Sequence, residues 1–542
     1  MHERAPQAST NAPSSTRTPR AGVNRIGSAA VAAIALAAAA ALSAPPALAD
    51  GPPTPGTPSA SASASAGRGV TDARRAARAG FALLSSPGST AFGAADPKLL
   101  RRYGYVENEY TVTGEACRYR ITAPLAVAQV VDCGHPYTTR MLVRQPAKKS
   151  HFNGTALVEW TNTSTGHDVD FAWSSTHAYQ MRKGYAAISL SAQVQGVKGL
   201  QDWNPERYGH LDLSASPTDP ETGTDDLAGA SGAYPEVLSF DVLTQTVRGL
   251  RHPGRHDPVR GKVKRVVAVG QSQSAGRLTD YYNSIDPLYK AVDGVVFYDA
   301  AGGLRTDSST KAISVASELG IRIGNTLKPL DTENTRRWEV AGASHNTTRE
   351  AAYFDPMILR DGWIKGANGR PTTLTATATG CSQSPAWTSV PTGYVLDSAI
   401  DHVVSWAKGG EPAPAAPVLV RDPKAPPIAA IGLVQGTLPG YAVDARGLTR
   451  GGIQLAEYVY STAVNKGAGT TGPGVCQLTG MHRYYSDAEL ITRYPDPKAY
   501  LDGAKKLIRS NVDHGYLLRS DANRSLADAK TVYRKLRTLQ GR

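Results

Sequence analysis

Short apolar runs and amphipathic stretches alternate through the middle of the chain. Three runs, at residues 155–160, 185–190 and 265–269, have the length and apolar composition of buried strands. The stretches between them, 169–182 and 236–251, repeat their apolar residues at helical spacing. Because strands that alternate with helices form a parallel sheet, this pattern predicts an α/β fold with a mostly parallel central sheet and helices on both faces.

Similar patterns continue on both sides of this region. Residues 105–143 contain segments of alternating polar and apolar positions, as antiparallel strands do. Segment 418–474 shows no clear period. Downstream of the central runs we expect strands at 292–299, 312–318 and 337–340, and helices at 396–408, 488–509 and 523–539.

Two segments interrupt the alternation of strands and helices. Residues 193–234 are rich in Gly, Pro, Asp and Ser and show no sustained period. A long irregular insertion in a compact domain is more often functional than idle, so we expect a lid or pocket wall over the sheet. A Pro- and Ala-rich connection at 410–417 opens a C-terminal extension, 410–542. We therefore expect a single domain, 70–542, that contains both segments.

The first residues are typical of a secretory signal peptide. Within residues 1–49, several arginines precede an Ala-rich apolar run, and an Ala-Leu-Ala cleavage site follows at 47–49. No Arg-Arg pair precedes the run and no Cys follows it directly, which favours the general export route and disfavours a lipid anchor. Residues 50–69 lack apolar anchors and are expected to form a disordered linker. We therefore expect a secreted, extracellular protein without a stable membrane anchor.

Cysteine usage agrees with export. The chain has four cysteines, Cys117, Cys133, Cys381 and Cys476, an even number that suits disulfide pairing outside the cytoplasm. None belongs to a C-x-x-C pair or lies beside a His at ligand spacing, which disfavours zinc, and we expect no metal. Of the three possible connectivities we favour the pairing of neighbours, Cys117 with Cys133 and Cys381 with Cys476. Free buried thiols remain the alternative.

Composition narrows the classes of function. The 542 residues carry a formal net charge of +13, with 19% charged and 41% hydrophobic residues, as expected for a globular protein with a large core. No block of consecutive Lys and Arg is interleaved with aromatic residues, so we expect no nucleic-acid binding. A moderately basic surface would favour an anionic substrate or a cell-wall polymer.

The apolar run at 265–269 leads through a Gly- and Ser-rich turn into a helical pattern at 275–283. A serine at such a strand-turn-helix junction is held clear of the backbone at the carboxyl end of the sheet, where it can act as a nucleophile. Two serines compete, because the turn contains both G-x-S-x-S and S-x-S-x-G. We choose Ser272, which directly follows the tightest part of the turn, over Ser274. A Gly- and Ser-rich loop without chemical importance remains the alternative.

Three strands after this turn each end on or lead to a candidate partner of the serine. The strand at 337–340 leads through a Gly-containing turn to His345. Glu318, at the end of the 312–318 strand, is our choice for the acid, with Asp331 and Asp299 as alternatives. Nucleophile, acid and histidine at successive strand ends follow the order of the α/β-hydrolase fold. The chemistry requires all three, because serine needs a base to take its proton and the base needs an acid to fix its tautomer.

The remaining component of such a site is a pair of backbone donors for the developing oxyanion. One is expected at the N–H of Gln273, the residue after the nucleophile. The other is expected in the loop that follows the 155–160 strand, from Asn162 or Thr163.

Two other patterns resemble ligand sites. Residues 467–472 match G-x-G-x-x-G, but Pro473 follows where a helix would have to start, so we expect a flexible loop. Residues 167–170, His-Asp-Val-Asp, carry side chains of the metal-ligand type, although capping of the following helix explains the aspartates equally well.

Three motifs occur together in this chain: VEW-x-N at 158–162, G-x-S-Q-S at 270–274 and EVAG-x-x-H at 339–345. With them the chain resembles the bacterial "alpha/beta hydrolase domain" family of secreted proteins, from about Cys117 to the C terminus. The family often carries T-E-x-D before the histidine. Here the stretch is Ser-Glu-Leu-Gly at 317–320, which keeps the glutamate and lacks the aspartate.

The resemblance implies serine hydrolase chemistry on carboxylic esters through a covalent acyl-enzyme, with no cofactor. The substrate would be a small-molecule or polymer-borne ester. Two alternatives remain: a peptidase or amidase with the same triad, and a hydrolase-like binding protein that has lost activity, because the elbow lacks its second glycine. Neither the acyl and alcohol parts of the substrate nor the oligomeric state follows from the sequence.

Overall fold

The computed structural model describes most of the chain after the predicted linker. The predicted signal peptide, 1–49, and linker, 50–69, lie outside the described residues. No helix within the described residues is both long enough and apolar enough to cross a lipid bilayer. The described residues are 77–541 except 86–88, 254–255, 300–302, 321–330, 367, 426–427, 430–436, 439, 473–475 and 477.

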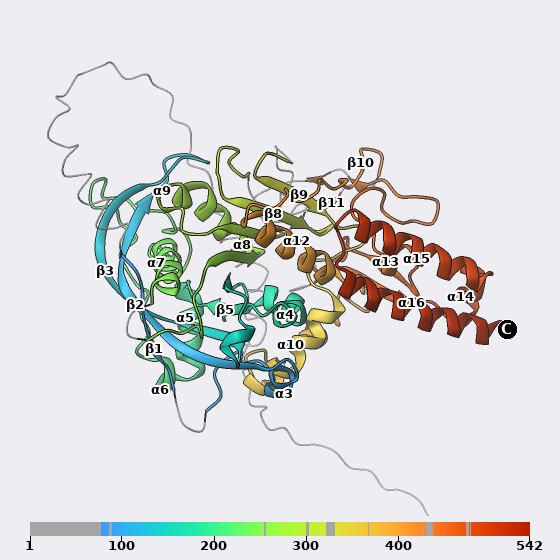
Figure 1. The fold of residues 1–542 in the computed structure, drawn as a ribbon, viewed down its shortest axis with the longest axis horizontal. Helices are drawn as coiled ribbons and strands as arrows, with labels where there is room; N and C mark the ends of the chain where they lie inside the picture. The colour runs from blue at the N-terminus through green and yellow to red at the C-terminus, as the bar shows by residue number, and fades with distance from the viewer. Residues whose placement is uncertain are drawn as a thin grey trace, which may run out of the picture.

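A nine-stranded sheet forms the centre of the described chain, with the strand order β1-β2-β3-β5-β4-β6-β7-β8-β9 (Figure 1). All pairs from β5 to β9 in this order are parallel, whereas β1, β2 and β3 are joined antiparallel. The predicted mostly parallel α/β sheet is therefore confirmed. The strands are β1 (Gly80–Leu83), β2 (Tyr105–Arg120), β3 (Gln129–Pro146), β4 (Thr155–Trp160), β5 (Ala186–Leu190), β6 (Arg265–Gln271), β7 (Gly294–Tyr298), β8 (Lys311–Ala316) and β9 (Thr335–Glu339).

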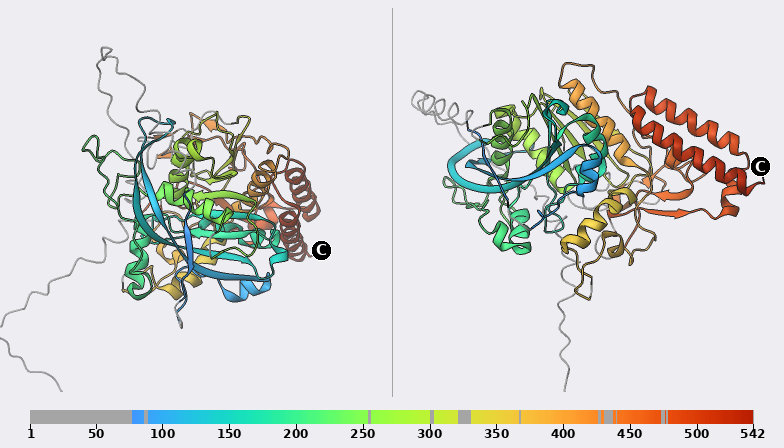
Figure 2. Two further views of the ribbon diagram at one scale, coloured as in Figure 1. Left: turned by 60° about the vertical axis from the view of Figure 1, so that its left-hand side comes forward. Right: turned by 60° about the horizontal axis from the view of Figure 1, so that its bottom comes forward.

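Helices cover the sheet and extend beyond it (Figures 1 and 2). Those of the first half of the described chain are α3 (Pro97–Arg102), η1 (Lys149–His151), α4 (Phe171–Lys183), α5 (Val194–Trp203), α6 (Pro205–Tyr208), α7 (Ser239–Arg251), α8 (Gln273–Asp280), η2 (Tyr281–Ile285) and α9 (Asp286–Tyr289). The second half contains α10 (Thr348–Asp361), α11 (Leu374–Thr377), α12 (Thr392–Trp406), α13 (Ala456–Val459), α14 (Asp487–Arg493), α15 (Pro497–Asp513) and α16 (Arg519–Leu539).

Alternate residues of the central strand β6 pack on opposite faces of the sheet. Val266 belongs to the hydrophobic cluster that contains Leu278 of α8, and Val267 belongs to the cluster that contains Leu396 of α12. Both valines are fully buried, and burying each contributes about 2 kcal/mol. Because helices cover both faces, β6 is a nearly continuous apolar run rather than an alternating one.

The predicted antiparallel segment forms a long hairpin, β2 and β3, that curves along one side of the molecule (Figure 1). Its register places Cys117 opposite Cys133, and a disulfide joins them. A second disulfide joins Cys381 to Cys476. Both predicted pairings are confirmed.

The insertion at 193–234 is less irregular than predicted, because it begins with helices α5 and α6. Two glycines in α5 hide the amphipathic pattern in the sequence. A Cβ at Gly196 would come within 2.2 Å of Asp168, and one at Gly199 within 2.3 Å of the Gly166 carbonyl. These glycines therefore let α5 pack closely against the loop that follows β4. The lid function of this insertion stays a prediction.

The C-terminal end forms a helical projection, in which α15 and α16 lie side by side (Figures 1 and 2). The single helix predicted at 488–509 is instead two helices, α14 and α15. Pro495 and Pro497 explain the break, because proline lacks an N–H and disfavours helical geometry in the residue before it. Asp496, between the two prolines, caps α15 by accepting from the N–H of Lys498.

The segment between α12 and α14, for which the sequence predicts no clear element, forms short strand pairs. β10 pairs with β13, β11 with β12, and β14 with β15. They are β10 (Arg421–Asp422), β11 (Ile428–Ala429), β12 (Thr437–Leu438), β13 (Gly440–Tyr441), β14 (Ala463–Lys466) and β15 (Met481–Tyr484).

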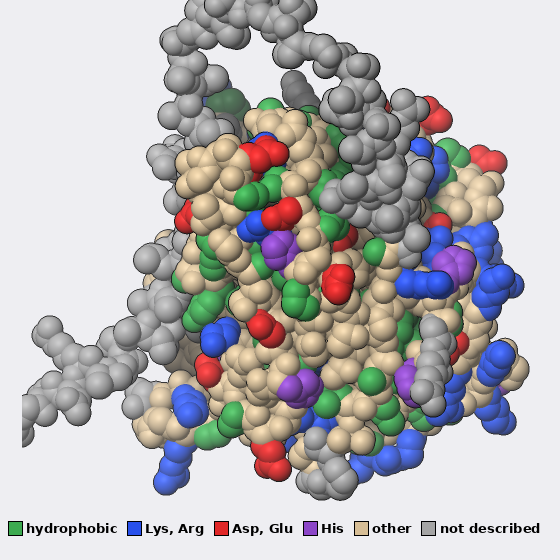
Figure 3. Space-filling model, turned by 90° about the vertical axis from the view of Figure 1, so that its left-hand side faces the viewer, with side chains coloured by type: hydrophobic (Ala, Val, Ile, Leu, Met, Phe, Trp, Pro, Cys, Tyr) green, Lys and Arg blue, Asp and Glu red, His purple; other side chains and the backbone are tan. Residues whose placement is uncertain are grey.

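The surface on the side of the β2–β3 hairpin carries mixed charges. Figure 3 shows acidic, basic and apolar side chains interspersed over most of this face, with Lys and Arg more frequent toward its lower right edge. This distribution resembles the scattered charge of the sequence, in which no basic block is present.

Candidate active site

The turn between β6 and α8 holds Ser272 in a strained backbone conformation. Ser272 has φ 58° and ψ −120°, a combination that residues with a side chain rarely adopt. Gly270 permits the sharp turn, because a Cβ there would approach the backbone of Ser274 and Ala275 to 3.0 Å. The Ser272 side chain is partly exposed, at the carboxyl end of β6 and before the first turn of α8. The predicted strand, turn and helix are therefore present.

Ser274, the competing serine, is used within the turn itself. Its Oγ accepts from the N–H of Gln271 at 3.1 Å and donates to the carbonyl of Gln271 at 3.0 Å. The residue is only 1% exposed. Because its hydroxyl closes the turn, the geometry favours Ser272 as the candidate nucleophile.

His345 lies in the loop that follows β9 and is buried. The chain reaches it through Gly342, which has φ 73° and where a Cβ would meet the Tyr458 ring at 2.3 Å. The Nδ1 atom of His345 is 2.7 Å from Oδ2 of Asp299. On one side the ring of Tyr298 stacks at a centroid distance of 6.4 Å, and the Tyr298 hydroxyl donates to a carbonyl of the histidine loop at 3.0 Å. These contacts determine both the position and the orientation of the imidazole.

Asp299 directly follows β7, and three hydrogen bonds hold its carboxylate. Oδ1 accepts from the N–H of Ser317 at 2.6 Å, while Oδ2 accepts from the Ser317 hydroxyl at 2.7 Å and faces His345. Because β7 is the sheet neighbour of β6, this strand end lies beside the elbow, where the N–H of Ser272 donates to the Tyr298 carbonyl at 2.9 Å.

The prediction that Glu318 orients the histidine is wrong in this structure, because Asp299 occupies that position. Glu318 Oε1 accepts from the N–H of Gly342 at 2.7 Å, and Oε2 accepts from the N–H of Gly467 at 3.0 Å. Burial raises the pKa of Glu318. Glu318 therefore connects the histidine loop to residues 467–472, the glycine-rich motif of the C-terminal extension.

Asp331, the other alternative for the acid, is also placed elsewhere. It is exposed and accepts from the N–H of Arg337 at 3.0 Å, within β9. Of the three acids considered, Asp299 is thus the one that contacts His345. The signal in the sequence was its place at the end of the strand next to the elbow, which has meaning only once the strand order is known.

The Nε2 atom of His345 faces the elbow. Within the described residues its hydrogen bond goes to Nε2 of Gln271, at 3.0 Å, rather than to Ser272. Gln271 is buried and immediately precedes Ser272. No feature of the sequence singled out Gln271, whose role depends on the packing of the histidine loop against the elbow.

The backbone donors expected for an oxyanion are only partly available. Gln273 starts α8, so its N–H lies in the first helical turn. Asn162 does not fit the prediction, because its N–H donates to the Val169 carbonyl at 2.9 Å and its side-chain amide donates to the Gln271 carbonyl at 2.9 Å. The N–H of Thr163 makes a long contact of 3.4 Å with Oε1 of Gln273. Gln273 and Thr163 therefore remain the candidate donors.

Gln193, which the sequence did not single out, supports this region. Its amide pairs reciprocally with the Gln273 side chain and also donates to the Thr161 carbonyl at 2.9 Å. Gln193 is fully buried at the start of the insertion. It therefore couples the insertion to the first turn of α8 and to the loop after β4.

Comparison with protein families identifies the fold. The model of the family described as "Alpha/beta hydrolase domain" matches residues 70–527. This chain belongs to that family. The predicted resemblance and the α/β-hydrolase fold are both confirmed. A search of curated proteins finds no match to the chain.

Solved structures with a similar fold share little sequence with this α/β hydrolase. XC6422 from Xanthomonas campestris, described as an a/b serine hydrolase without lid, is 10% identical with a TM-score of 0.23, covering 43% of this chain and 85% of its own. Esterase Est22 is 10% identical with a TM-score of 0.27, and the match covers 51% of this chain and 83% of Est22. The rice cell wall degrading esterase LipA from Xanthomonas oryzae is 12% identical with a TM-score of 0.20, covering 42% and 50%.

The acidic residues near the VEW-x-N motif of this α/β hydrolase have structural partners. Glu159 accepts from the N–H groups of Ala172 and Trp173, at 2.7 and 2.8 Å, at the start of α4, and burial raises its pKa. Asp168 accepts from the Thr161 hydroxyl at 2.7 Å. Asp170 pairs with a buried arginine at 2.6 Å. These contacts give the two aspartates of 167–170 hydrogen-bond and ion-pair partners that require no metal. The partners lie in the loop and on a buried arginine, rather than at the helix start where capping was expected.

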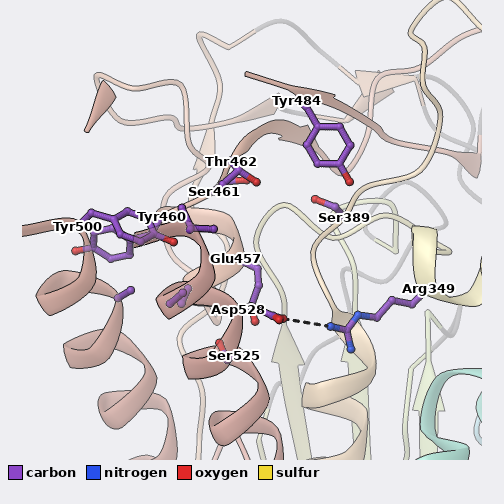
Figure 4. A pocket seen from close by; sticks show the side chains of 14 residues that line it. Arg349, Ser389, Glu457, Tyr460, Ser461, Thr462, Tyr484, Tyr500, Ser525 and Asp528 are labelled. Carbon is purple, nitrogen blue, oxygen red and sulfur yellow. Dashed lines mark ion pairs between the residues drawn. The ribbon is translucent and has the colours of Figure 1, made fainter. Parts of the chain in front are cut away.

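A cavity of about 210 Å³ lies away from these residues, between the start of α10 and the C-terminal helices (Figure 4). Its lining includes neither Ser272 nor His345. Arg349 reaches across it to Asp528 of α16 at 3.9 Å. Glu457 lies beside this pair, and burial raises its pKa. The cavity therefore marks the contact between the hydrolase core and the helical projection.

Proposed function

We propose that this α/β hydrolase is a secreted serine esterase that cleaves carboxylic esters through a covalent acyl-enzyme. The observation that carries the proposal is the 2.7 Å contact between Asp299 and His345 beside the strained elbow of Ser272. A buried acid, an imidazole and a serine on a strand-to-helix elbow are the groups that nucleophilic acyl transfer requires.

The proposed reaction has two halves. Ser272 Oγ forms a bond to the carbonyl carbon while its proton passes to Nε2 of His345, and Asp299 holds Nδ1–H and stabilises the imidazolium. His345 then gives the proton to the alcohol oxygen as the ester C–O bond breaks, which leaves the acyl group on Ser272. A water molecule, deprotonated by His345, attacks the acyl group, and the carboxylic acid and free Ser272 are regenerated.

The negative charge on the carbonyl oxygen requires donors. The N–H of Gln273 and the N–H of Thr163 are the proposed pair, and each such donor lowers the barrier by about 3 kcal/mol. The 3.4 Å contact of Thr163 with the Gln273 side chain is long enough for an oxyanion to replace it. The first turn of α8 adds a favourable helix dipole.

Secretion and substrate class are part of the same proposal. The predicted signal peptide at 1–49 and the two disulfides support an extracellular location. The substrate is proposed to be a small-molecule or polymer-borne ester, with the 193–234 insertion as a pocket wall. The chain 70–542 is proposed to act as one hydrolase domain, with 410–542 as its C-terminal extension.

The first test is hydrolysis of p-nitrophenyl esters of increasing acyl length by residues 50–542, beside Ser272→Ala and Ser274→Ala. We expect Ser272→Ala to abolish turnover and organophosphonate labelling. Ser274→Ala, whose hydroxyl only closes the turn, is expected to keep both at a reduced level. If Ser274→Ala loses labelling and Ser272→Ala keeps it, Ser274 is the nucleophile.

The same experiment separates the alternatives. Faster release of p-nitroaniline from amide substrates than of p-nitrophenol from esters would favour a peptidase or amidase with this triad. An absence of both turnover and phosphonate labelling in the wild type would favour a hydrolase-like binding protein.

A further inference from the structure

In this structure Nε2 of His345, the proposed base, accepts a hydrogen bond from Gln271, a residue outside the triad. Nδ1 of His345 faces the carboxylate of Asp299, so Nδ1 carries the hydrogen and Nε2 presents its lone pair. The amide nitrogen of Gln271 lies 3.0 Å from that Nε2. The atom that must accept the Ser272 proton is therefore already a hydrogen-bond acceptor.

The neighbours of Gln271 determine which way its amide points. Its nitrogen also lies 3.4 Å from the His345 carbonyl, which can only accept, and its oxygen lies 3.4 Å from Nδ2 of Asn162. The Asn162 amide is itself oriented, because Nδ2 donates to the Gln271 carbonyl and Oδ1 accepts from the N–H of Ser164. All of these contacts agree with a nitrogen, and not an oxygen, facing Nε2.

An imidazole nitrogen has one lone pair, so it cannot accept fully from Gln271 and from Ser272 at the same time. A donor at Nε2 stabilises the neutral imidazole and opposes the imidazolium, which would place two N–H groups against each other. We propose that Gln271 is a positioning residue that holds His345 in its proton-accepting tautomer until Ser272 takes its place. This inference rests on the proposed function, because it assigns a role within the same triad.

Other titratable groups pack around the histidine loop but meet it elsewhere. Asp299 contacts Nδ1, Tyr298 lies along the ring face, and Glu318 accepts from a backbone N–H of the loop. Glu350 of α10 accepts from the N–H of Thr347, two residues beyond His345. Within the described residues, the side-chain contact at Nε2 comes from Gln271. Replacing Gln271 therefore changes one contact of the imidazole and leaves the others in place.

The experiment is the pH dependence of kcat/KM for a p-nitrophenyl ester in the wild type, Gln271→Met and Gln271→Glu. Methionine keeps the length of the side chain and removes the donor. We expect the midpoint of the acidic limb to rise by about 0.5–1 pH unit in Gln271→Met, the equivalent of one hydrogen bond. It should rise by about 1 unit or more in Gln271→Glu, because a carboxylate favours the imidazolium.

The matched control is Gln273→Met, two residues along the same elbow. Within the described residues, the hydrogen bonds of the Gln273 side chain go to Gln193 and Thr163 rather than to His345. Its loss is expected to lower the rate at all pH values without moving the midpoint. An unmoved midpoint in active Gln271→Met and Gln271→Glu would overturn the inference.

A measurement that needs no ester hydrolysis tests the role of Gln271 separately from the proposed esterase function. In ¹⁵N-histidine-labelled protein, NMR titration follows the protonation of His345 directly, with the signal assigned through His345→Gln. A titration that moves to higher pH in Gln271→Met supports the contact even if no ester is cleaved, whereas an unchanged titration overturns it. Absence of ester turnover with a shifted titration would refute only the esterase proposal.

Discussion

Replacing Asp299 with asparagine would remove the charge that determines the histidine tautomer. An amide nitrogen at the Oδ2 position would face Nδ1 as a donor, so Nδ1 would lose the acceptor that holds its hydrogen. Without that acceptor, neither the proton-accepting tautomer of His345 nor the imidazolium formed during the reaction is stabilised. We expect kcat to fall by about 10⁴-fold, or about 5.5 kcal/mol, with little change in KM.

Glu318→Gln is the matched control, because Glu318 follows the next strand and is also buried but contacts two backbone N–H groups, at 2.7 and 3.0 Å. Glutamine can accept from only one of them with its oxygen. We expect this variant to lose about 1–3 kcal/mol of stability, while the folded enzyme keeps kcat within about tenfold of the wild type.

The assay is steady-state hydrolysis of one p-nitrophenyl ester by both variants, with urea unfolding of each protein. The unfolding curves give the fraction of folded enzyme by which kcat is corrected. The assignment of Asp299 is refuted if Asp299→Asn stays active while Glu318→Gln loses about 10⁴-fold of kcat. In that case Glu318 is the acid.

Three further predictions concern stability. Ser272→Gly is expected to raise the free energy of unfolding by about 1 kcal/mol over Ser272→Ala, because glycine adopts φ 58° without strain, and equal Tm values would contradict this. Cys381→Ser opens a disulfide between residues 95 positions apart and should cost about 2–5 kcal/mol in urea unfolding, and an unchanged midpoint would contradict it. Burial raises the pKa of Asp280 to about 6, so the folded state keeps a proton that the unfolded chain loses near pH 4, and stability falls as pH rises from about 4 to 6. The free energy of unfolding of Asp280→Asn should therefore exceed that of the wild type by about 2 kcal/mol at pH 8 and by little at pH 4. A difference that does not depend on pH would show that the burial of Asp280 does not cause the change in stability.

The local pattern of the sequence was sufficient for most of the sheet. The run at 155–160 is β4 with the same bounds, and 265–269 forms most of β6, because buried strands are apolar throughout. Proline chemistry explains the split of the predicted 488–509 helix, and two glycines conceal α5. These errors are local, since each depends on how a few residues override the average pattern of their neighbours.

The candidate nucleophile and base could also be predicted from the sequence, because an elbow serine and a histidine after a strand are local motifs. The partner of the histidine could not. Asp299 and Glu318 both follow strands and both become buried. Which carboxylate reaches Nδ1 depends on β7, not β8, lying next to β6 in the sheet.

The sequence by itself therefore determined the α/β architecture and the elbow, because these depend on local periodicity and on turn residues. It favoured the pairing of neighbouring cysteines, and the structure decided between the possible connectivities. Tertiary structure alone decided that Asp299 contacts His345, that Glu318 supports the loop and that Gln271 faces Nε2. The physical reason is that a hydrogen bond needs two groups within about 3 Å. For residues 46 or 74 positions apart, only strand order and loop packing determine that distance.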